Sequence, residues 1–237
     1  WYDNYAYGLF DNIQDMTISL ISGYRYKFEC TMIQNDNDII YHDKNGYYGR
    51  PFMSGDNYNG DYNANTVTQL TNKFHVSTTT YRYLDYIKYG TTDVCTESSF
   101  VRSNYPKTDR FYGELTDYIP TKDGVANIDL KRTAFGLKFI VTPPVDGKLY
   151  INSITINNES NSINSNVEVS AGENVLETSF MCTFYEVYKC WQAEDYTKDL
   201  TIQLKWERAN GATQTFSKTI TVKRNVMTTV NVNVNGS

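Results

Sequence analysis

Residues 124–157 read GVANIDLKRTAFGLKFIVTPPVDGKLYINSITIN, and three segments of this sequence alternate apolar with polar residues. A period of two places one side of a strand against a core and the other side against water or a second layer. Pro143-Pro144 cannot donate to a strand ladder, and Asp146-Gly147 suits a tight reversal. The sequence therefore predicts three successive strands that begin a β-sandwich. Their apolar positions are Ala126, Ile128, Leu130, Phe135, Leu137, Phe139, Val141 and residues within 149–156.

The chain after residue 157 continues with short strands and turns. Residues 167–169, 180–189, 216–222 and 230–234 are expected to be strands, and Asn210-Gly211 is a hairpin signal. The clearest alternation is that of Leu200, Ile202, Leu204 and Trp206 with the polar residues between them. About seven strands with breaks every 8–12 residues are typical of a sandwich, and no helix is predicted here.

The chain before residue 120 is rich in tyrosine and in long loops. One strand is predicted from the row Tyr24, Tyr26, Phe28, Cys30 and Met32, which should face a core. Residues 44–65 are predicted to form a loop of about 20 residues, a length that indicates a functional or mobile segment. Residues 80–89 favour a short helix ended by Gly90, and residues 91–123 look irregular apart from strands near 111–112 and 118–119.

This change of composition near residue 120 divides the chain in two. The 237 residues are enough for two β domains of ordinary size. The predicted boundary runs from Ile119-Pro120 to Asp123-Gly124. The expected fold is all-β, with one sandwich in residues 1–120 and a second in residues 121–237.

Composition excludes several function classes. A net charge of -5 argues against nucleic acid, because a surface that follows phosphates needs clustered Lys and Arg. No apolar run approaches the roughly 20 residues that span a bilayer. The sequence begins at Trp1 rather than Met, so we expect a processed form whose signal peptide or lipid-bearing cysteine lay upstream.

The four cysteines, Cys30, Cys95, Cys182 and Cys190, form no CxxC pair. On one continuous strand Cys182 and Cys190 would lie about 26 Å apart at ~3.3 Å per residue, beyond the reach of a disulfide. Buried free thiols are the favoured interpretation, and a disulfide across a chain reversal is the alternative.

Recognised catalytic and metal-binding motifs are missing from the sequence. There is no nucleophile elbow, phosphate-binding glycine loop or HExxH motif, and His42 and His75 have no recognised ligand spacing. Residues 57–61 resemble part of a calcium loop, but its twelfth position is Thr68 where the loop needs Glu. We therefore predict no enzyme, no catalytic or metal-binding residue and no cofactor. A hydrolase with two carboxylates brought together by the fold is a weak alternative.

The long loop carries aromatic residues that allow two interpretations. Exposed rings could stack on sugars or anchor a protein partner, and rings packed on the sheet would be structural. The second interpretation is favoured. The candidate aromatic binding loop comprises Tyr47, Tyr48, Phe52, Tyr58 and Tyr62.

Four short motifs carry a family resemblance: GYRYKF at 23–28, DRFYG at 109–113, IDLKRTAFGLKF at 128–139 and VKRNVMTTVNV at 222–232. Together they resemble the fimbrillins of Bacteroidetes-type (type V) pili and the related cell-adhesion surface lipoproteins. The resemblance spans most of residues 16–234.

The resemblance implies two transthyretin-like β-sandwich (Greek-key) domains in tandem. It also implies an exported lipoprotein of the cell surface, outer membrane or fimbrium, anchored through an upstream lipid. Subunits of such pili are trimmed after an Arg in the first domain, and a strand from the next subunit then fills the opened groove, which is β-strand addition. The partners would be other fimbrial subunits or further copies of the chain, with a host or bacterial surface protein or glycan as an adhesion target.

No cleavage site transfers to this chain from the family. Arg25 is expected inside a core strand, and Arg50 precedes Pro51, a poor bond for most proteases. The final strand, within residues 226–235, is the candidate donor or edge strand, and the alternative is an ordinary strand of its own sheet. Its candidate residues are Val226, Val230, Val232 and Val234. A glycan-binding surface lipoprotein that uses the loop aromatics is the alternative function.

Overall fold

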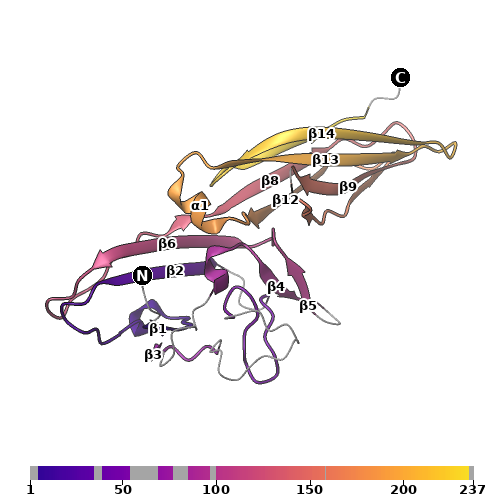
Figure 1. Cartoon of the computed structure of the whole chain (residues 1–237). Coiled ribbons are helices and arrows are strands. Elements are labelled where there is room, and N and C mark those ends of the chain that lie inside the picture. The colour runs from indigo at the N-terminus through magenta and orange to yellow at the C-terminus, as the bar shows by residue number, and fades with distance from the viewer. Residues whose placement is uncertain are drawn as a thin grey trace.

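The protein consists of two lobes that follow each other along the chain (Figure 1). The computed structural model describes residues 5–34, 39–53, 69–76, 85–96, 100–157 and 159–234. Strands dominate both lobes, so the predicted all-β class is confirmed.

The N-terminal lobe is built on a sheet in which the long strand β6 lies between β2 and β7. β2 pairs antiparallel with β6 over nearly its whole length, and β7 extends β6 on its other side by two pairs. Two-stranded sheets, β1 with β3 and β4 with β5, complete the lobe. Its elements are β1 (Ala6–Tyr7), η1 (Ile13–Asp15), β2 (Tyr26–Gln34), β3 (His75–Val76), η2 (Asp85–Lys88), β4 (Thr92–Cys95), β5 (Phe100–Ser103), β6 (Asp109–Tyr118) and β7 (Lys131–Arg132).

The C-terminal lobe is a sandwich of two sheets. One sheet has the order β10-β9-β13-β14 with β11 also on β9, and the other has the order β12-β8-β15. Figure 1 shows the β9, β13 and β14 ribbons lying along those of β8 and β12. Its elements are β8 (Ala134–Val141), β9 (Lys148–Ile156), β10 (Ser162–Ile163), β11 (Val167–Ser170), β12 (Leu176–Thr183), α1 (Val187–Gln192), β13 (Thr197–Glu207), β14 (Thr213–Lys223) and β15 (Met227–Val232).

The core of the sandwich follows the predicted alternation. The alternating apolar residues of β8 and β13 are nearly all buried between the sheets, and only Leu204 among them keeps part of its surface exposed. The predicted reversal at Asp146-Gly147 is also present: Gly147 has φ +69°, and a Cβ there would lie 1.9 Å from the carbonyl oxygen of Glu207. The β13–β14 hairpin turns at Asn210-Gly211 as expected.

The first predicted strand of residues 124–157 is wrong. Only Lys131 and Arg132 pair with β6, and residues 124–130 form no ladder. Ala126, Ile128 and Leu130 are nevertheless half-buried, while Asn127 and Asp129 between them are exposed. The cause lies at Gly113 of β6, where an added Cβ would lie 2.4 Å from the carbonyl oxygen of Asp129. A Cβ projects from the face of a sheet, so the carbonyl of Asp129 lies over the face of β6 at Gly113. The chain therefore crosses this face instead of pairing along the edge of β6.

The expected strand over residues 180–189 is also partly wrong. β12 ends at Thr183, and the helix α1 begins at Val187. Val187 and Cys190, one helical turn apart, are buried. α1 contacts β6 and η2 at the junction of the lobes, and this tertiary contact overrides the strand preference of the sequence.

The side chains predicted to form the core-facing row of β2 are only partly buried. Tyr24 precedes the strand and is 65% exposed, and Met32 is 41% exposed. Tyr26, Phe28 and Cys30 are half-buried. The rings of Tyr26 and Phe28 pack edge-on against Tyr5 and Tyr118, at 5.4 and 5.7 Å between centres.

Two further expectations for the N-terminal half need correction. Residues 91–123 contain the ten-residue β6 and the strands β4 and β5, where mostly irregular chain was expected. Of the helix expected over 80–89, the described part is the short 3-10 helix η2 (Asp85–Lys88). Tyr105 packs into the core of the C-terminal sandwich, and the domain boundary near residue 120 stays a prediction.

Candidate functional site

The last strand, β15, forms one edge of the β12-β8-β15 sheet. It runs parallel to β8 from Met227 opposite Gly136 to Val232 opposite Val141. The carbonyls of Val226 and Val232 accept hydrogen bonds from the amides of Gly136 and Thr142, at 2.9 and 2.8 Å. Backbone groups alternate in direction along a strand, so those of Met227, Thr229 and Asn231 point to the free edge.

This free edge lacks the usual protection against pairing with another chain. Natural edge strands are shielded by charges, prolines, bulges, short length or a covering segment. Residues 225–234, by contrast, contain no charged residue and no proline. Among the described strands, β8 alone pairs with β15.

The other edges of the sandwich are protected. In β14, Lys218 lies opposite Ile202, which is buried, so the edge strand carries a charge on its core-facing side. β10 and β11, on the opposite edge of that sheet, have two and four residues. β15 therefore differs from these edge strands, because it has six residues, no charge and an outer side that pairs with no other described strand.

The remaining edge strand, β12, carries the charged Glu177 and is covered at its end, Thr183, by the segment around residues 106–108. The carbonyl of Pro106 accepts the amide of Thr183 at 3.0 Å, and the hydroxyls of Thr108 and Thr183 lie 2.7 Å apart. The Lys107 ammonium lies 4.4 Å from the ring centre of Phe180.

The four predicted edge-strand valines occupy different environments. Val232 and Val234 are 5% and 9% exposed, Val230 is half-buried, and Val226 is 41% exposed before the strand begins. The buried valines thus anchor β15 as an ordinary strand of its own sheet, which was the alternative interpretation. The free edge is formed by the backbone groups on the side of β15 away from β8.

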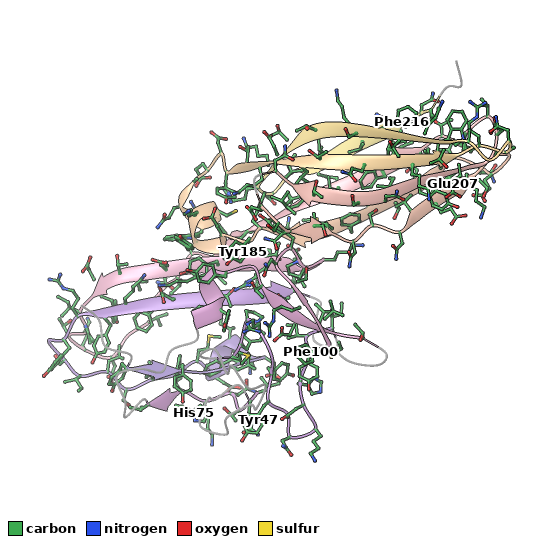
Figure 2. All side chains as sticks on the ribbon, turned by 45° about the vertical axis from the view of Figure 1, so that its right-hand side comes forward. Tyr47, His75, Phe100, Tyr185, Glu207 and Phe216 are labelled. Carbon is green, nitrogen blue, oxygen red and sulfur yellow. The ribbon has the colours of Figure 1, made fainter. Side chains whose placement is uncertain are left out.

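The candidate aromatic loop is only partly described. The Tyr48 ring lies 5.2 Å from His42 and 6.3 Å from Phe52, almost perpendicular to Phe52 at 84°. Tyr47, Tyr48 and Phe52 are half-buried, and Figure 2 places Tyr47 in the N-terminal lobe. These rings form no coplanar platform. Tyr58 and Tyr62 lie outside the described residues, as does the partial calcium-loop motif at 57–61.

The two arginines considered as cleavage sites differ sharply in the exposure of their side chains. Arg25 precedes β2 and its side chain is 62% exposed, 3.2 Å from Asp117, so the expectation that it lies inside a core strand is wrong. Arg50 is 5% exposed and its guanidinium lies 3.6 Å from Asp93, which is also buried. Arg25 is thus the more accessible of the two.

All four cysteines are free thiols, but the expected burial holds only for Cys182 and Cys190, since Cys30 and Cys95 are partly exposed. Cys182 and Cys190 are buried, and burial raises the pKa of each thiol to about 12. A protonated thiol is a weak nucleophile and metal ligand.

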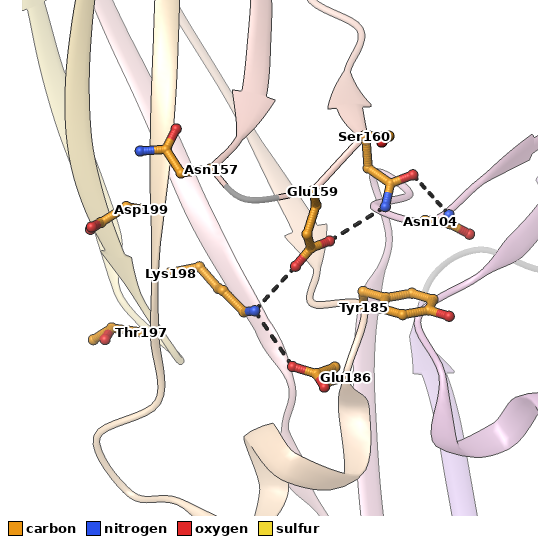
Figure 3. A pocket seen from close by; sticks show the side chains of 10 residues that line it. Asn104, Asn157, Glu159, Ser160, Tyr185, Glu186, Thr197, Lys198 and Asp199 are labelled. Atoms are coloured by element: carbon orange, nitrogen blue, oxygen red, sulfur yellow. Dashed lines mark hydrogen bonds and ion pairs between the residues drawn. The ribbon is translucent and has the colours of Figure 1, made fainter.

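Sequence reasoning missed a polar cleft where β13, α1 and the β9–β10 turn meet (Figure 3). Its lining residues come from four separate stretches of chain, and no local motif joins them. In the part of the chain that is described, no group of three or more His, Cys, Asp and Glu residues could hold a metal ion. No described helix combines the length and apolar character needed to cross a membrane.

Comparisons of this chain with protein-family models, with curated proteins and with solved structures found no match.

Proposed function

We propose that this chain is a non-catalytic cell-surface subunit, fimbrial or fimbria-associated, that assembles by β-strand addition at the free edge of β15. The observation that carries the proposal is the uncharged edge at Met227, Thr229 and Asn231, which pairs with no other described strand. An extended segment of a second subunit would pair with these outward amides and carbonyls, and main-chain hydrogen bonds would supply the affinity.

The fimbrillin resemblance supports the same mode of assembly. In that family two transthyretin-like sandwiches exchange strands after proteolytic trimming of an exported lipoprotein. Arg25 offers an exposed bond for such trimming, and cleavage there would remove β1 and its pairing with β3. The chain would then act at the cell surface or in a fimbrium, with further copies or other subunits as partners.

The test compares intact protein with protein trimmed by an Arg-specific protease. Light scattering coupled to size exclusion and unboiled denaturing gels report the assembly state. Thr229→Pro removes an outward N–H without breaking the β8 ladder, and Asn231→Lys places a charge on the edge. After trimming, wild-type protein should form multimers, and both variants should stay monomeric.

Thr219→Lys is the matched control, since it adds the same charge to an exposed position of β14. It should assemble like the wild type. Multimers of equal size in all variants would show that another surface makes the contact, and a persistent wild-type monomer under both conditions would remove the assembly role.

A further inference from the structure

A cleft of about 720 Å³ opens near the junction of the two lobes (Figure 3). Glu159 and Asn161 reach it from the β9–β10 turn, Lys198 from the start of β13, and Tyr185 from the segment before α1. Figure 2 shows Tyr185 at this junction, away from Tyr47. The volume lies in the range of small-molecule sites, which is about 300–1,000 Å³.

Hydrogen bonds hold the acidic side chains of the cleft in place. The hydroxyl of Tyr105, whose ring is buried, donates to both carboxylate oxygens of Glu159, at 3.0 and 2.9 Å. The Lys198 ammonium lies 3.1 Å from Glu159 and 3.4 Å from Glu186. These polar groups are therefore positioned before any ligand arrives, which lowers the entropy cost of binding.

The amides of the cleft belong to the same network. Asn104 donates to the side-chain oxygen of Asn161 at 2.9 Å, and Asn161 donates to Glu159 at 3.4 Å. Asn157 lies on the other side of β13, where its Oδ1 atom accepts the hydroxyl of Thr201 at 2.6 Å.

The cations of the cleft are already paired. The carboxylates of Glu159 and Glu186 face it, and both hold the one ammonium of Lys198. Asp199 alternates with Lys198 along β13, so its carboxylate lies on the other side of the strand, where it accepts the hydroxyl of Thr221. Among the described lining residues, a phosphate, sulfate or carboxylate ligand therefore finds no free cation, and an apolar ligand would leave the amides and carboxylates unpaired.

We infer that this cleft binds an uncharged carbohydrate. A sugar hydroxyl both donates and accepts, so it can pair with carboxylates and amides together, as this lining offers. The Tyr185 ring, tilted against Tyr89 at 5.6 Å between centres, adds an aromatic wall for a sugar ring. A carbohydrate bound here would be an adhesion target of the proposed surface subunit. The test of carbohydrate binding does not depend on assembly at β15.

The experiment incubates labelled monomer on an array of neutral, sialylated and sulfated oligosaccharides, and then titrates the best neutral one by calorimetry. A neutral saccharide should bind above background, and its acidic derivatives should bind more weakly. Glu159→Gln and Tyr185→Leu should each weaken binding about tenfold, the cost of one lost polar or stacking contact. Asp123→Ala, an exposed acid in the loop after β6, is the control and should bind like the wild type.

Three results would overturn the inference. One is that no neutral saccharide binds above background, and another is that acidic saccharides bind best. The third is that binding survives both cleft variants and is lost in Tyr47→Ala or Tyr48→Ala, which would move the site to the loop aromatics.

Discussion

At the residue scale, the most consequential side chain is Arg110, which is fully buried in β6. Its guanidinium donates to the carbonyls of Tyr86, Ile87 and Tyr89 at 2.6–3.1 Å and to the hydroxyl of Thr31 at 2.9 Å. The arginine thus closes the end of η2 and ties it to the sheet. A cation there stabilises the last carbonyls of the helical turn.

Arg110→Met should lower the free energy of unfolding by about 3 kcal/mol or more, because buried carbonyls lose their donors. Arg110→Lys should recover little, since an ammonium cannot reproduce the planar fork. Urea denaturation measures both. Arg25→Met, which removes an exposed pair with Asp117, should change stability by under about 1 kcal/mol. Equal effects at both arginines would contradict this account.

The buried thiols give a second test at this scale. Cys182 and Cys190 should resist a maleimide in the folded protein, and all four cysteines should react in denaturant without reductant. Fewer than four reactive thiols in denaturant would indicate a disulfide.

These thiols also couple stability to pH. The folded state keeps their protons up to a pKa of about 12, and the unfolded thiols lose them near 9.0, so the unfolded state binds fewer protons between these values. Their stabilising contribution is complete below about pH 9 and is lost as the pH rises toward 12. Cys182→Ala should therefore reduce the decline in urea stability between about pH 8 and 10. An unchanged decline would contradict the assignment.

At the element scale, the strands that could be predicted from sequence are those with a buried face on a second sheet. β8, β13 and the β13–β14 hairpin follow their alternation, because burial enforces the period of two. β6 was predicted only as short pieces near 111–112 and 118–119, and α1 was not predicted. Their structure depends on contacts between distant segments: Gly113 beneath Asp129, and Val187 against Tyr112 and Ile87. The cleft was missed for the same reason, because Asn104, Glu159 and Lys198 are far apart in sequence.

The close approach at Gly113 leads to a prediction about residues 124–130. Gly113→Ala places a methyl group 2.4 Å from the Asp129 carbonyl oxygen, and so the segment must move off β6. The free energy of unfolding should fall by about 1–3 kcal/mol, the usual cost of overpacking. Gly124→Ala, whose Cβ has no neighbour nearer than 4.0 Å, is the control and should change little in urea denaturation. A neutral Gly113→Ala would contradict the crossing of β6 at this point.

At the scale of the whole molecule, the sandwich and the junction have separate roles in this account. The sandwich protects three of its edges and leaves β15 open, which makes assembly directional. The junction holds the polar cleft, and its opening does not involve β15. A subunit of this design can join others through one edge while the proposed carbohydrate site stays available.

The measurement that tests this account most directly is residue-resolved amide hydrogen exchange on monomer and on assembled protein. In the monomer, the outward amides of Met227, Thr229 and Asn231 should exchange fast, and the inward amides of Thr228 and Val230 should be protected by β8. Assembly should slow the outward amides to the rates of their inward neighbours. Assembled protein in which Thr229 and Asn231 still exchange as fast as in the monomer would contradict strand addition at β15.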